Sequence, residues 1–277
     1  MGSGSSDALV SRVARAAREP GSRRTLLLDL DGTLAPIAPT PEEARVPAET
    51  VEALRELARA GWRVAVISGR SLADLASKID GKGFRLFGSH GLEDSADAGG
   101  RSRLSPGTGE RLRALAASAA DLERSFPGAR VEVKTFGVAF HDRGLRGRSL
   151  FAWRREVRAL LDAGDLRGLA ILAGKRVLEV RPAEAEKGRV AEALLAGRAP
   201  RGIDESLVAI GDDRTDEDLF AALSGRGLTI RVGRASRRTA AGSRLPSPRA
   251  VGRFLSGLAV RAGKGASGRK GPRGGRP

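Results

Sequence analysis

Short apolar runs alternate with amphipathic stretches along most of the chain, and this alternation predicts the order of its elements. Residues 24–30 and 62–69 have the apolar runs of buried strands, whereas residues 47–61 have the apolar spacing of a helix that ends at Gly61. Further strands are predicted at residues 84–91, 206–213 and 227–233, and further helices at residues 71–79, 187–197 and 215–225. Strands that alternate with helices, without strict polar alternation, are typical of a parallel sheet covered on both faces.

The middle of the chain follows a different pattern. Residues 129–143 alternate polar and apolar side chains around a central Phe-Gly pair, as the strands of an antiparallel hairpin do. Helices are predicted at residues 107–126 and 149–164, and short strands at residues 168–174 and 175–182. We therefore expect an α/β fold in which a doubly wound parallel sheet, at residues 22–98 and 182–258, carries an inserted α+β domain at residues 99–181.

The composition is that of a globular protein with room for one large or two modest domains: 277 residues, 40% of them hydrophobic and 30% charged. The absence of cysteine excludes disulfides and thiolate catalysis. No apolar run approaches the roughly 18 residues of a membrane span, and the small polar residues that open the chain do not form a signal peptide. We expect a cytoplasmic monomer with no membrane partner, whose residues 1–21 form a short leader and a helix.

The net charge of +16 is concentrated towards the carboxyl terminus. From Arg226 onward the chain holds 14 Lys and Arg and no acidic residue, so the remainder is nearly neutral. Residues 259–277 are rich in glycine and basic residues and are predicted to form a disordered tail. Such a tail can bind phosphate backbones, which leaves open a nucleic-acid-binding protein on a degenerate enzyme scaffold. No aromatic stacking residue accompanies the terminal charges, so we expect no specific nucleic-acid partner.

Polar residues gather where the predicted strands end. Asp29 and Asp31 follow the first strand, and residues i and i+2 of a strand share a face, so both carboxylates are expected to project together. Two like charges that close are stabilised when a cation lies between them. Other strand ends and helix starts carry Ser68, Gly69, Arg70, Lys187 and Asp212. Each motif alone is an ordinary turn, cap or surface lysine, but their joint occurrence at strand ends indicates one site.

These residue types suit phosphoryl chemistry. A Mg²⁺ ion that bridges Asp29, Asp31 and Asp212 would have the all-oxygen ligands that a hard dication prefers. Asp29 comes first out of the strand and is best placed to attack phosphorus, while Asp31 can protonate the leaving oxygen and then deprotonate water. Gly32 permits a tight turn, and Thr33 can hold the aspartates by hydrogen bonds.

The segments DLDGT, SGR, the later Lys187 and GDDRTDED resemble, in order, the four motifs of haloacid-dehalogenase-like phosphatases. More narrowly, LLLDLDGTLAPI, VAVISGR, GSHGLE, VEVKTFGVAFHDR and AIGDDRTDEDLF are similar to segments of trehalose-6-phosphate phosphatases. The resemblance runs from about residue 24 to residue 232. It implies a phosphatase whose catalytic residues are Asp29 as nucleophile, Asp31 as acid and base, and Lys187.

The resemblance also assigns binding roles. It implies that Mg²⁺ is held by Asp29, by the backbone carbonyl of Asp31 and by Asp212, with support from Asp213 and Asp216 behind these ligands. The phosphoryl group would be held by Gly32, Thr33, Ser68, Gly69 and Lys187. The implied reaction converts trehalose 6-phosphate to trehalose and phosphate through an aspartyl-phosphate. Because the catalytic motifs do not distinguish sugars, sucrose phosphate and glucosylglycerate phosphate remain alternative substrates.

The resemblance makes the inserted domain a cap that recognises the sugar. Substrate-binding roles would fall to Arg70, His90, Glu93, Glu132, Lys134, His141, Arg143 and Glu179. Strand alternation places Glu132 and Lys134 on one face, and it does the same for His141 and Arg143 on the partner strand. Without the resemblance, these side chains would be the solvated face of an antiparallel sheet. Asp142 stands where an aromatic residue is usual, and we expect it to change the packing of the cap rather than its chemistry.

Overall fold

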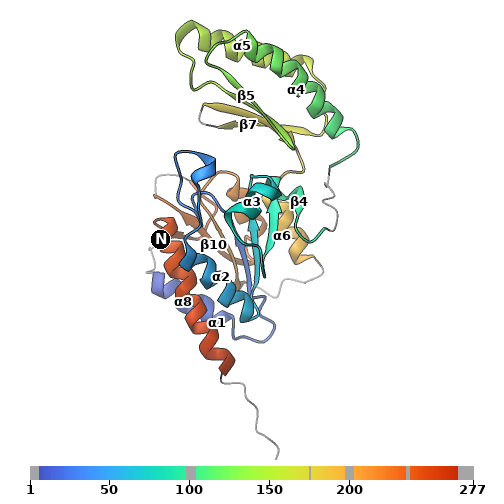
Figure 1. The fold of residues 1–277 in the computed structure, drawn as a ribbon. Helices are drawn as coiled ribbons and strands as arrows, with labels where there is room; N and C mark the ends of the chain where they lie inside the picture. The colour runs from blue at the N-terminus through green and yellow to red at the C-terminus, as the bar shows by residue number, and fades with distance from the viewer. Residues whose placement is uncertain (1–5, 98–103, 175, 197–202, 235–237, 268–277) are drawn as a thin grey trace, which may run out of the picture. The chain divides into compact units, whose positions relative to one another are not determined.

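The structure is a computed structural model that describes residues 6–97, 104–174, 176–196, 203–234 and 238–267. The chain divides into a core unit, formed by Met1–Gly100 and Glu186–Pro277, and an inserted unit, Arg101–Ala185 (Figure 1). The predicted fold class is confirmed, because the core unit holds a mainly parallel sheet and the inserted unit a second, antiparallel sheet. The first five residues of the predicted leader lie outside the described residues.

The core unit is built on a seven-stranded sheet in the order β11-β10-β9-β1-β2-β3-β4. Its strands are β1 (Thr25–Leu28), β2 (Arg63–Ile67), β3 (Arg85–Gly88), β4 (Glu93–Asp94), β9 (Asp204–Gly211), β10 (Gly227–Val232) and β11 (Ser243–Leu245). Neighbouring strands pair in parallel, except that β4 is antiparallel to β3. The sequence did not predict β4 and β11, because two and three residues are too short to show a period.

Helices cover both faces of this sheet (Figure 1). They are α1 (Ser6–Ala16), α2 (Ala48–Arg59), α3 (Leu72–Lys78), α6 (Lys187–Leu195), α7 (Asp216–Ala222) and α8 (Pro248–Ser267). Because side chains alternate along a strand, Leu26 and Leu28 pack with α1, α2 and α8, whereas Leu27 packs with α6 and α7 on the opposite face. Ser71 caps the start of α3, since its side chain accepts a hydrogen bond from the Asp74 backbone N–H.

The predicted disordered tail at residues 259–277 is wrong in its first part, because α8 continues to Ser267. Leu258 and Ala259 are buried in the same cluster as side chains of α1 and α2. Together with Phe254 and Leu255 they form an apolar stripe at helical spacing, and the packing of this stripe outweighs the low helix propensity of nearby glycines. The remaining part of the predicted tail, residues 268–277, lies outside the described residues.

The inserted unit is a four-stranded antiparallel sheet in the order β5-β6-β8-β7, packed on two helices. Its elements are α4 (Thr108–Arg124), β5 (Arg130–Lys134), β6 (Gly137–His141), α5 (Gly147–Ala163), β7 (Leu169–Gly174) and β8 (Val177–Pro182). Trp153 of α5 is buried at the centre, with the Phe126 ring centroid 5.5 Å from its own in an edge-on arrangement. Val138, Phe140 and Val180 complete this core, which leaves the other face of the sheet free for polar side chains.

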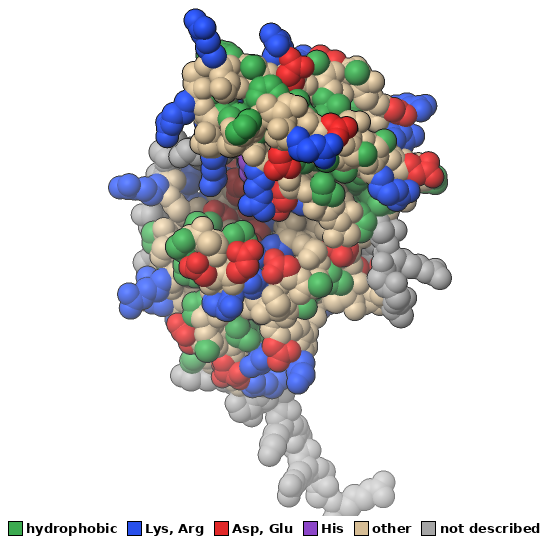
Figure 2. All heavy atoms as spheres, turned by 45° about the horizontal axis from the view of Figure 1, so that its top comes forward, with side chains coloured by type: hydrophobic (Ala, Val, Ile, Leu, Met, Phe, Trp, Pro, Cys, Tyr) green, Lys and Arg blue, Asp and Glu red, His purple; other side chains and the backbone are tan. Residues whose placement is uncertain are grey.

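The surface carries charges of both signs. On the face shown in Figure 2, basic and acidic side chains are interspersed over the described residues. Ion pairs at the surface of the described residues, such as Arg55 with Asp80 at 2.9 Å and Arg158 with Asp162 at 3.3 Å, contribute little to stability. Within the described ranges, no helix has both the length and the hydrophobicity needed to cross a bilayer.

Candidate active site

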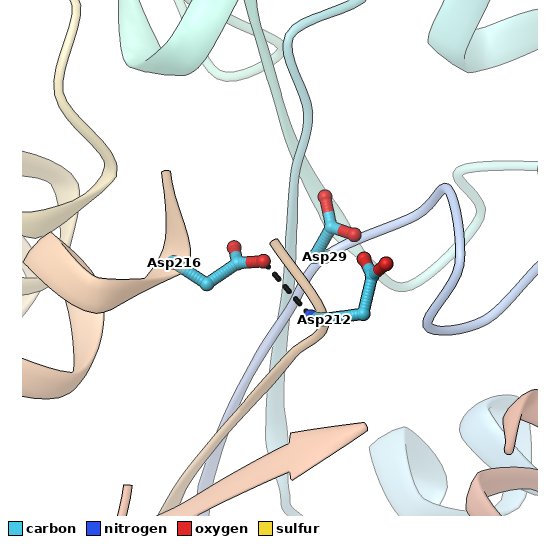
Figure 3. A group of neighbouring side chains, drawn as sticks. All are labelled: Asp29, Asp212 and Asp216. Carbon is cyan, nitrogen blue, oxygen red and sulfur yellow. Dashed lines mark hydrogen bonds between the residues drawn. The ribbon is translucent and has the colours of Figure 1, made fainter. Parts of the chain in front are cut away.

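Three carboxylates meet at the carboxyl-terminal edge of the core sheet. Asp29 follows β1, Asp212 follows β9, and Asp216 is the first residue of α7. Because β1 and β9 are parallel neighbours, with Leu28 beside Ile210, the two aspartates leave the sheet side by side. One carboxylate oxygen from each of the three lies within 4.8 Å of the others (Figure 3). The sequence predicted that these residues belong to one site.

Lys187 supplies one positive charge to this cluster. Its Nζ lies 2.5 Å from Oδ1 of Asp29 and 2.7 Å from Oδ1 of Asp216, and all three side chains are buried. Lys187 is also the first residue of α6, and the dipole of a helix disfavours a cation at this end. The two carboxylates therefore stabilise a lysine at a position where the helix itself does not. Burial by itself would lower the pKa of Lys187, but the charges of Asp216 and Asp29 raise it above its ordinary value. Lys187 is therefore a permanent cation in this site.

The cluster has more negative than positive charge. One ammonium faces three carboxylates, which leaves two negative charges, the charge that a single dication would balance. Burial raises the pKa of Asp29 well above its usual range. Burial, together with the neighbouring carboxylates of Asp216 and Asp213, raises the pKa of Asp212 to about 6. Their all-oxygen chemistry and unbalanced charge fit a hard dication such as Mg²⁺.

The three carboxylates are not equally free to hold a metal. One oxygen of Asp216 accepts a hydrogen bond from the ammonium of Lys187. The other accepts the backbone N–H of Asp212 at 3.0 Å (Figure 3), and that of Asp213 at 3.0 Å. Asp216 therefore anchors the loop that carries Asp212 rather than pointing free oxygens into the cluster. Asp213 is exposed, and its Oδ1 accepts the backbone N–H of Arg214 at 2.6 Å. Asp29 and Asp212 are thus the side chains best able to hold a dication.

The turn after β1 brings the backbone against Asp212. Gly32 has φ +81°, and a Cβ atom at this position would lie 2.3 Å from Oδ2 of Asp212. Only glycine therefore combines this backbone conformation with this close approach. The next residue, Thr33, is fully buried, and its hydroxyl donates to Oδ1 of Asp212 at 3.5 Å. Gly32 and Thr33, two of the predicted phosphate-binding residues, therefore lie directly beside the carboxylate cluster.

Asp31 has a separate cationic partner. Its two carboxylate oxygens accept Nε and Nη2 of Arg70 at 2.7 and 2.8 Å, and Nη1 of Arg70 donates to Asp74 at 2.6 Å. The hydrogen bond to Asp31 raises the pKa of Arg70. The two side chains have different cationic partners, because Lys187 pairs with Asp29 and Arg70 with Asp31. A metal ion between the two aspartates stays a prediction. The predicted metal role of Asp31 through its backbone carbonyl stays a prediction.

The neighbouring strand ends hold the other predicted residues of the core unit. Ser68 is buried after β2, and its hydroxyl accepts the backbone N–H of Arg70 at 3.2 Å. His90 lies so close to Gly69 that a Cβ atom on the glycine would be 2.6 Å from the imidazole Nε2. Glu93 accepts the backbone N–H of Leu72 at 3.0 Å and the hydroxyl of Ser89 at 2.7 Å. In this structure Glu93 holds the segment that carries His90.

Ser89 and His90 adopt a strained backbone. Both have positive φ, 49° and 56°, although neither is glycine. Their backbone N–H groups donate to the carbonyls of Arg70, at 2.7 Å, and of Ser68, at 2.8 Å. The contacts of this segment with the turn after β2 therefore compensate a conformation that costs about 1–3 kcal/mol at a non-glycine residue.

In the inserted unit, most of the predicted substrate-binding residues lie on the polar face of the sheet and form ion pairs there. Lys134 of β5 donates to Glu179 of β8 at 2.9 Å, and His141 of β6 lies 3.0 Å from Glu132 of β5. Lys134 reaches across β6 because its partner there is Gly137, which has no side chain. Arg143 departs from the expectation, since β6 ends at His141 and Arg143 lies exposed in the following turn.

Asp142 is buried on the opposite side of this segment. Its carboxylate pairs with Arg154 of α5 and with Arg176, each at 2.8 Å. Arg176 has φ +65° and also donates to the carbonyl of Leu145 at 2.7 Å. Asp142 therefore joins α5, the end of β6 and the start of β8 through charge, in line with the expected effect on packing.

Sequence reasoning missed Arg231, a buried residue beneath the site. It lies in β10 beside Gly211, the last residue of β9, and its Nη2 donates to the carbonyl of Asp212 at 2.6 Å. Its Nη1 also pairs with Glu217 of α7. A charged residue within the apolar segment GLTIRVG was the available signal, because a buried charge requires a partner.

Comparisons with known proteins agree with this geometry. The trehalose-phosphatase family profile matches residues 27–249. A trehalose-phosphate phosphatase of Mycobacterium marinum is 36% identical over 245 residues, covering 86% of this chain and 62% of the relative. A trehalose 6-phosphate phosphatase of Zea mays is 32% identical over 269 residues, covering 89% of this chain and 73% of the relative.

Other relatives are much longer than the shared region. An uncharacterized glycosyl hydrolase of Mycobacterium tuberculosis is 38% identical over 273 residues, which cover 92% of this chain but 20% of the relative. This chain thus spans about a fifth of that protein, and less than two thirds of the Mycobacterium marinum phosphatase.

Solved structures show the same fold. The trehalose-6-phosphate phosphatase of Aspergillus fumigatus, 26% identical, matches with a TM-score of 0.67 over 91% of this chain and 97% of its own. A phosphatase of the haloalkanoate (HAD) superfamily from Bacteroides thetaiotaomicron, 17% identical, matches with a TM-score of 0.57 over 85% of this chain and 95% of its own. At that identity the likeness concerns the fold alone.

Proposed function

Because the chain belongs to the trehalose-phosphatase family, we propose that it hydrolyses trehalose 6-phosphate to trehalose and phosphate in a Mg²⁺-dependent reaction. The observation that carries this proposal is the group of buried Asp29, buried Lys187 and half-buried Asp212 at the edge where β1 and β9 end. It combines a nucleophile, hard oxygen ligands and a fixed cation, which are the parts that phosphoryl transfer requires.

In the proposed reaction, one carboxylate oxygen of Asp29 attacks phosphorus while the bond from phosphorus to the sugar oxygen breaks. Asp31, protonated on one oxygen that Arg70 releases while the other oxygen keeps its hydrogen bond, gives this proton to the departing sugar oxygen, which yields trehalose and an aspartyl-phosphate. Asp31 then takes a proton from water, whose oxygen attacks phosphorus and releases phosphate and free Asp29. Lys187, Thr33 and Ser68 hold the phosphoryl oxygens during both steps.

The metal would be held by the carboxylates of Asp29 and Asp212 and by the backbone carbonyl of Asp31. When bound, Mg²⁺ neutralises charge on the phosphoryl group and on the carboxylate that attacks it. Lys187 and Asp216 orient Asp29 and the Asp212 loop through the contacts described above. Burial raises the pKa of Asp29 in the metal-free protein, and a bound dication would favour the ionised carboxylate that the attack requires.

Recognition of the sugar is proposed for the polar face of the inserted unit. Glu132, Lys134, His141 and Glu179 gather there as charged pairs, flanking a strip where Gly137 and Ala139 have little or no side chain. A disaccharide offers hydroxyl groups, and charged side chains form strong hydrogen bonds with hydroxyls. These residues would accordingly distinguish trehalose 6-phosphate from other sugar phosphates.

The proposal is tested by measuring phosphate release from trehalose 6-phosphate, sucrose 6-phosphate, glucosylglycerate phosphate and an aryl phosphate. We expect the highest kcat/KM on trehalose 6-phosphate, loss of activity in excess chelator and recovery with added Mg²⁺. Preference for another sugar phosphate would overturn the proposed substrate but would leave the proposed phosphatase activity standing. Full activity in excess chelator would overturn the proposed dependence on Mg²⁺. A chain shortened by removing residues 268–277, which leaves α8 complete, should retain full activity.

A further inference from the structure

Arg231 is a buried cation that lies directly under the loop that carries Asp212. Its side-chain hydrogen bonds go to backbone carbonyls of this loop and to Glu217, and not to the carboxylates of Asp29, Asp212 or Asp216. It is 5% exposed. In the parallel register of β10 and β9, Arg231 is paired with Gly211, so its guanidinium reaches the peptide groups that immediately follow β9. Its neighbours Ile230 and Val232 face the cluster packed on α1, α2 and α8, which directs Arg231 towards α7.

The backbone of the Asp212 loop is held from two sides. Asp216 accepts the N–H groups of Asp212 and Asp213, each at 3.0 Å. Arg231 donates to the carbonyls of the same two residues, through Nη2 to Asp212 at 2.6 Å and through Nη1 to Asp213 at 3.4 Å. The peptide groups on either side of Asp212 are consequently fixed, and so is the direction in which its carboxylate leaves the backbone.

The guanidinium is itself held in place. Nη1 pairs with Glu217, and the second carboxylate oxygen of Glu217 accepts the backbone N–H of Ala240 at 2.7 Å. Because the planar fork of an arginine presents donors in fixed directions, one side chain can hold both carbonyls and Glu217 together. A lysine has a single charged nitrogen on a flexible stem and lacks this geometry.

We propose that Arg231 is a positioning residue for the metal, which makes the Asp212 site rigid and thereby selective for Mg²⁺ over Ca²⁺. This inference rests on the proposed function. Mg²⁺ demands short bonds and nearly ideal octahedral geometry, whereas Ca²⁺ accepts longer bonds and variable geometry. With its carbonyl committed to Arg231, Asp212 offers a dication only its carboxylate, in one direction. Without Arg231, the carbonyl and the carboxylate become mobile, which costs Mg²⁺ far more than Ca²⁺.

The test is calorimetric titration of the full chain, freed of metal by chelator, with Mg²⁺ and separately with Ca²⁺. For Arg231→Met we expect the Kd for Mg²⁺ to rise by at least about tenfold, as for other residues that orient metal ligands, and the Kd for Ca²⁺ to change by about twofold or less. Arg231→Lys should show the same loss of selectivity, because charge without the fork does not hold two carbonyls. Arg85→Met, which breaks an ion pair with Asp94 in the same sheet, should leave both Kd values unchanged.

Thermal unfolding of each variant separates positioning from stability. Equal Mg²⁺ affinity in a folded Arg231→Met variant and in the wild type would overturn the inference, and so would equal losses for both ions. If Arg231→Met does not fold, the same two comparisons of Mg²⁺ and Ca²⁺ affinity are made with Arg231→Lys. A wild-type protein that binds no Mg²⁺ would overturn this inference and the metal-dependent function together, whereas unchanged selectivity in the variants would overturn this inference alone.

Discussion

The ammonium of Lys187 lies 2.5 Å from Oδ1 of Asp29, although the two residues are 158 positions apart in the sequence. The whole inserted unit lies between these two residues in the chain. Because Lys187 holds one oxygen of Asp29, the other oxygen keeps its lone pairs for a metal or for phosphorus. This pairing gives the two oxygens of a single carboxylate different roles.

The first prediction concerns that carboxylate. Asp29→Asn keeps the shape of the side chain but removes the attacking charge and one metal ligand, so kcat should fall by at least about three orders of magnitude. Phosphate release measures the loss, and Asp80→Asn, which changes an exposed carboxylate of the same unit, is the matched control. Activity of Asp29→Asn within roughly tenfold of the control would remove Asp29 from the nucleophilic role.

The second prediction concerns pH. Asp212 has a pKa of about 6 in the metal-free protein, where burial favours its protonated form. A dication binds only ionised carboxylates, so the affinity for Mg²⁺ should fall as the pH is lowered from about 7 to about 5 and Asp212 takes up a proton. Protonation of Asp29, whose pKa burial also raises, should add to this loss. Titration calorimetry across this range measures the change, with circular dichroism as the control for folding. Constant affinity down to about pH 5 would show that Asp212 is ionised without metal.

The third prediction separates two roles for Arg70. The resemblance implies that Arg70 binds substrate, whereas the structure shows its fork closed on both oxygens of Asp31. If Arg70 orients the acid and base, Arg70→Lys should lower kcat by about tenfold to a hundredfold and leave KM nearly unchanged. If Arg70 binds substrate, KM should rise instead. Arg55→Lys, which changes the ion pair with Asp80 at the surface, serves as the control.

The sequence predicted the residues that lie at strand ends, because the carboxyl ends of parallel strands meet at one edge. Asp29, Asp212 and Lys187 could thus be assigned to one site before any distance was known. The partner of each carboxylate could not be predicted, since the choice between Lys187 and Arg70 depends on side-chain directions within the turn after β1.

Arg231 and the end of α8 show two further limits of the sequence. Arg231 lies in a predicted strand, but its role depends on its register beside Gly211, which a pattern of apolar residues does not fix. The helix beyond residue 258 has a glycine-rich, basic composition typical of a disordered tail. It forms because Leu258 and Ala259 pack in the cluster that includes α1 and α2, and this tertiary contact is absent from local composition.

The last prediction concerns the inserted unit, where Glu132 pairs with His141 and Lys134 with Glu179. If these pairs grip the second sugar, binding energy from the sugar contributes to the transition state for hydrolysis. Alanine at Glu132 or Lys134 should then cost about 2–3 kcal/mol of transition-state stabilisation on trehalose 6-phosphate, because a charged hydrogen-bond partner is left unpaired.

An aryl phosphate has no second sugar, so its kcat/KM should be nearly the same in both variants and in the wild type. Glu156→Ala removes an exposed ion pair on α5 and should leave both substrates unaffected. Equal losses on the two substrates would mean that Glu132 and Lys134 support the fold or the catalytic residues. No loss on either substrate would mean that Glu132 and Lys134 are only solvent-facing side chains of an antiparallel sheet. Either result would mean that these residues give no support to trehalose recognition. The proposed phosphatase chemistry would be unaffected, because it rests on residues of the core unit such as Asp29, Asp31, Asp212 and Lys187.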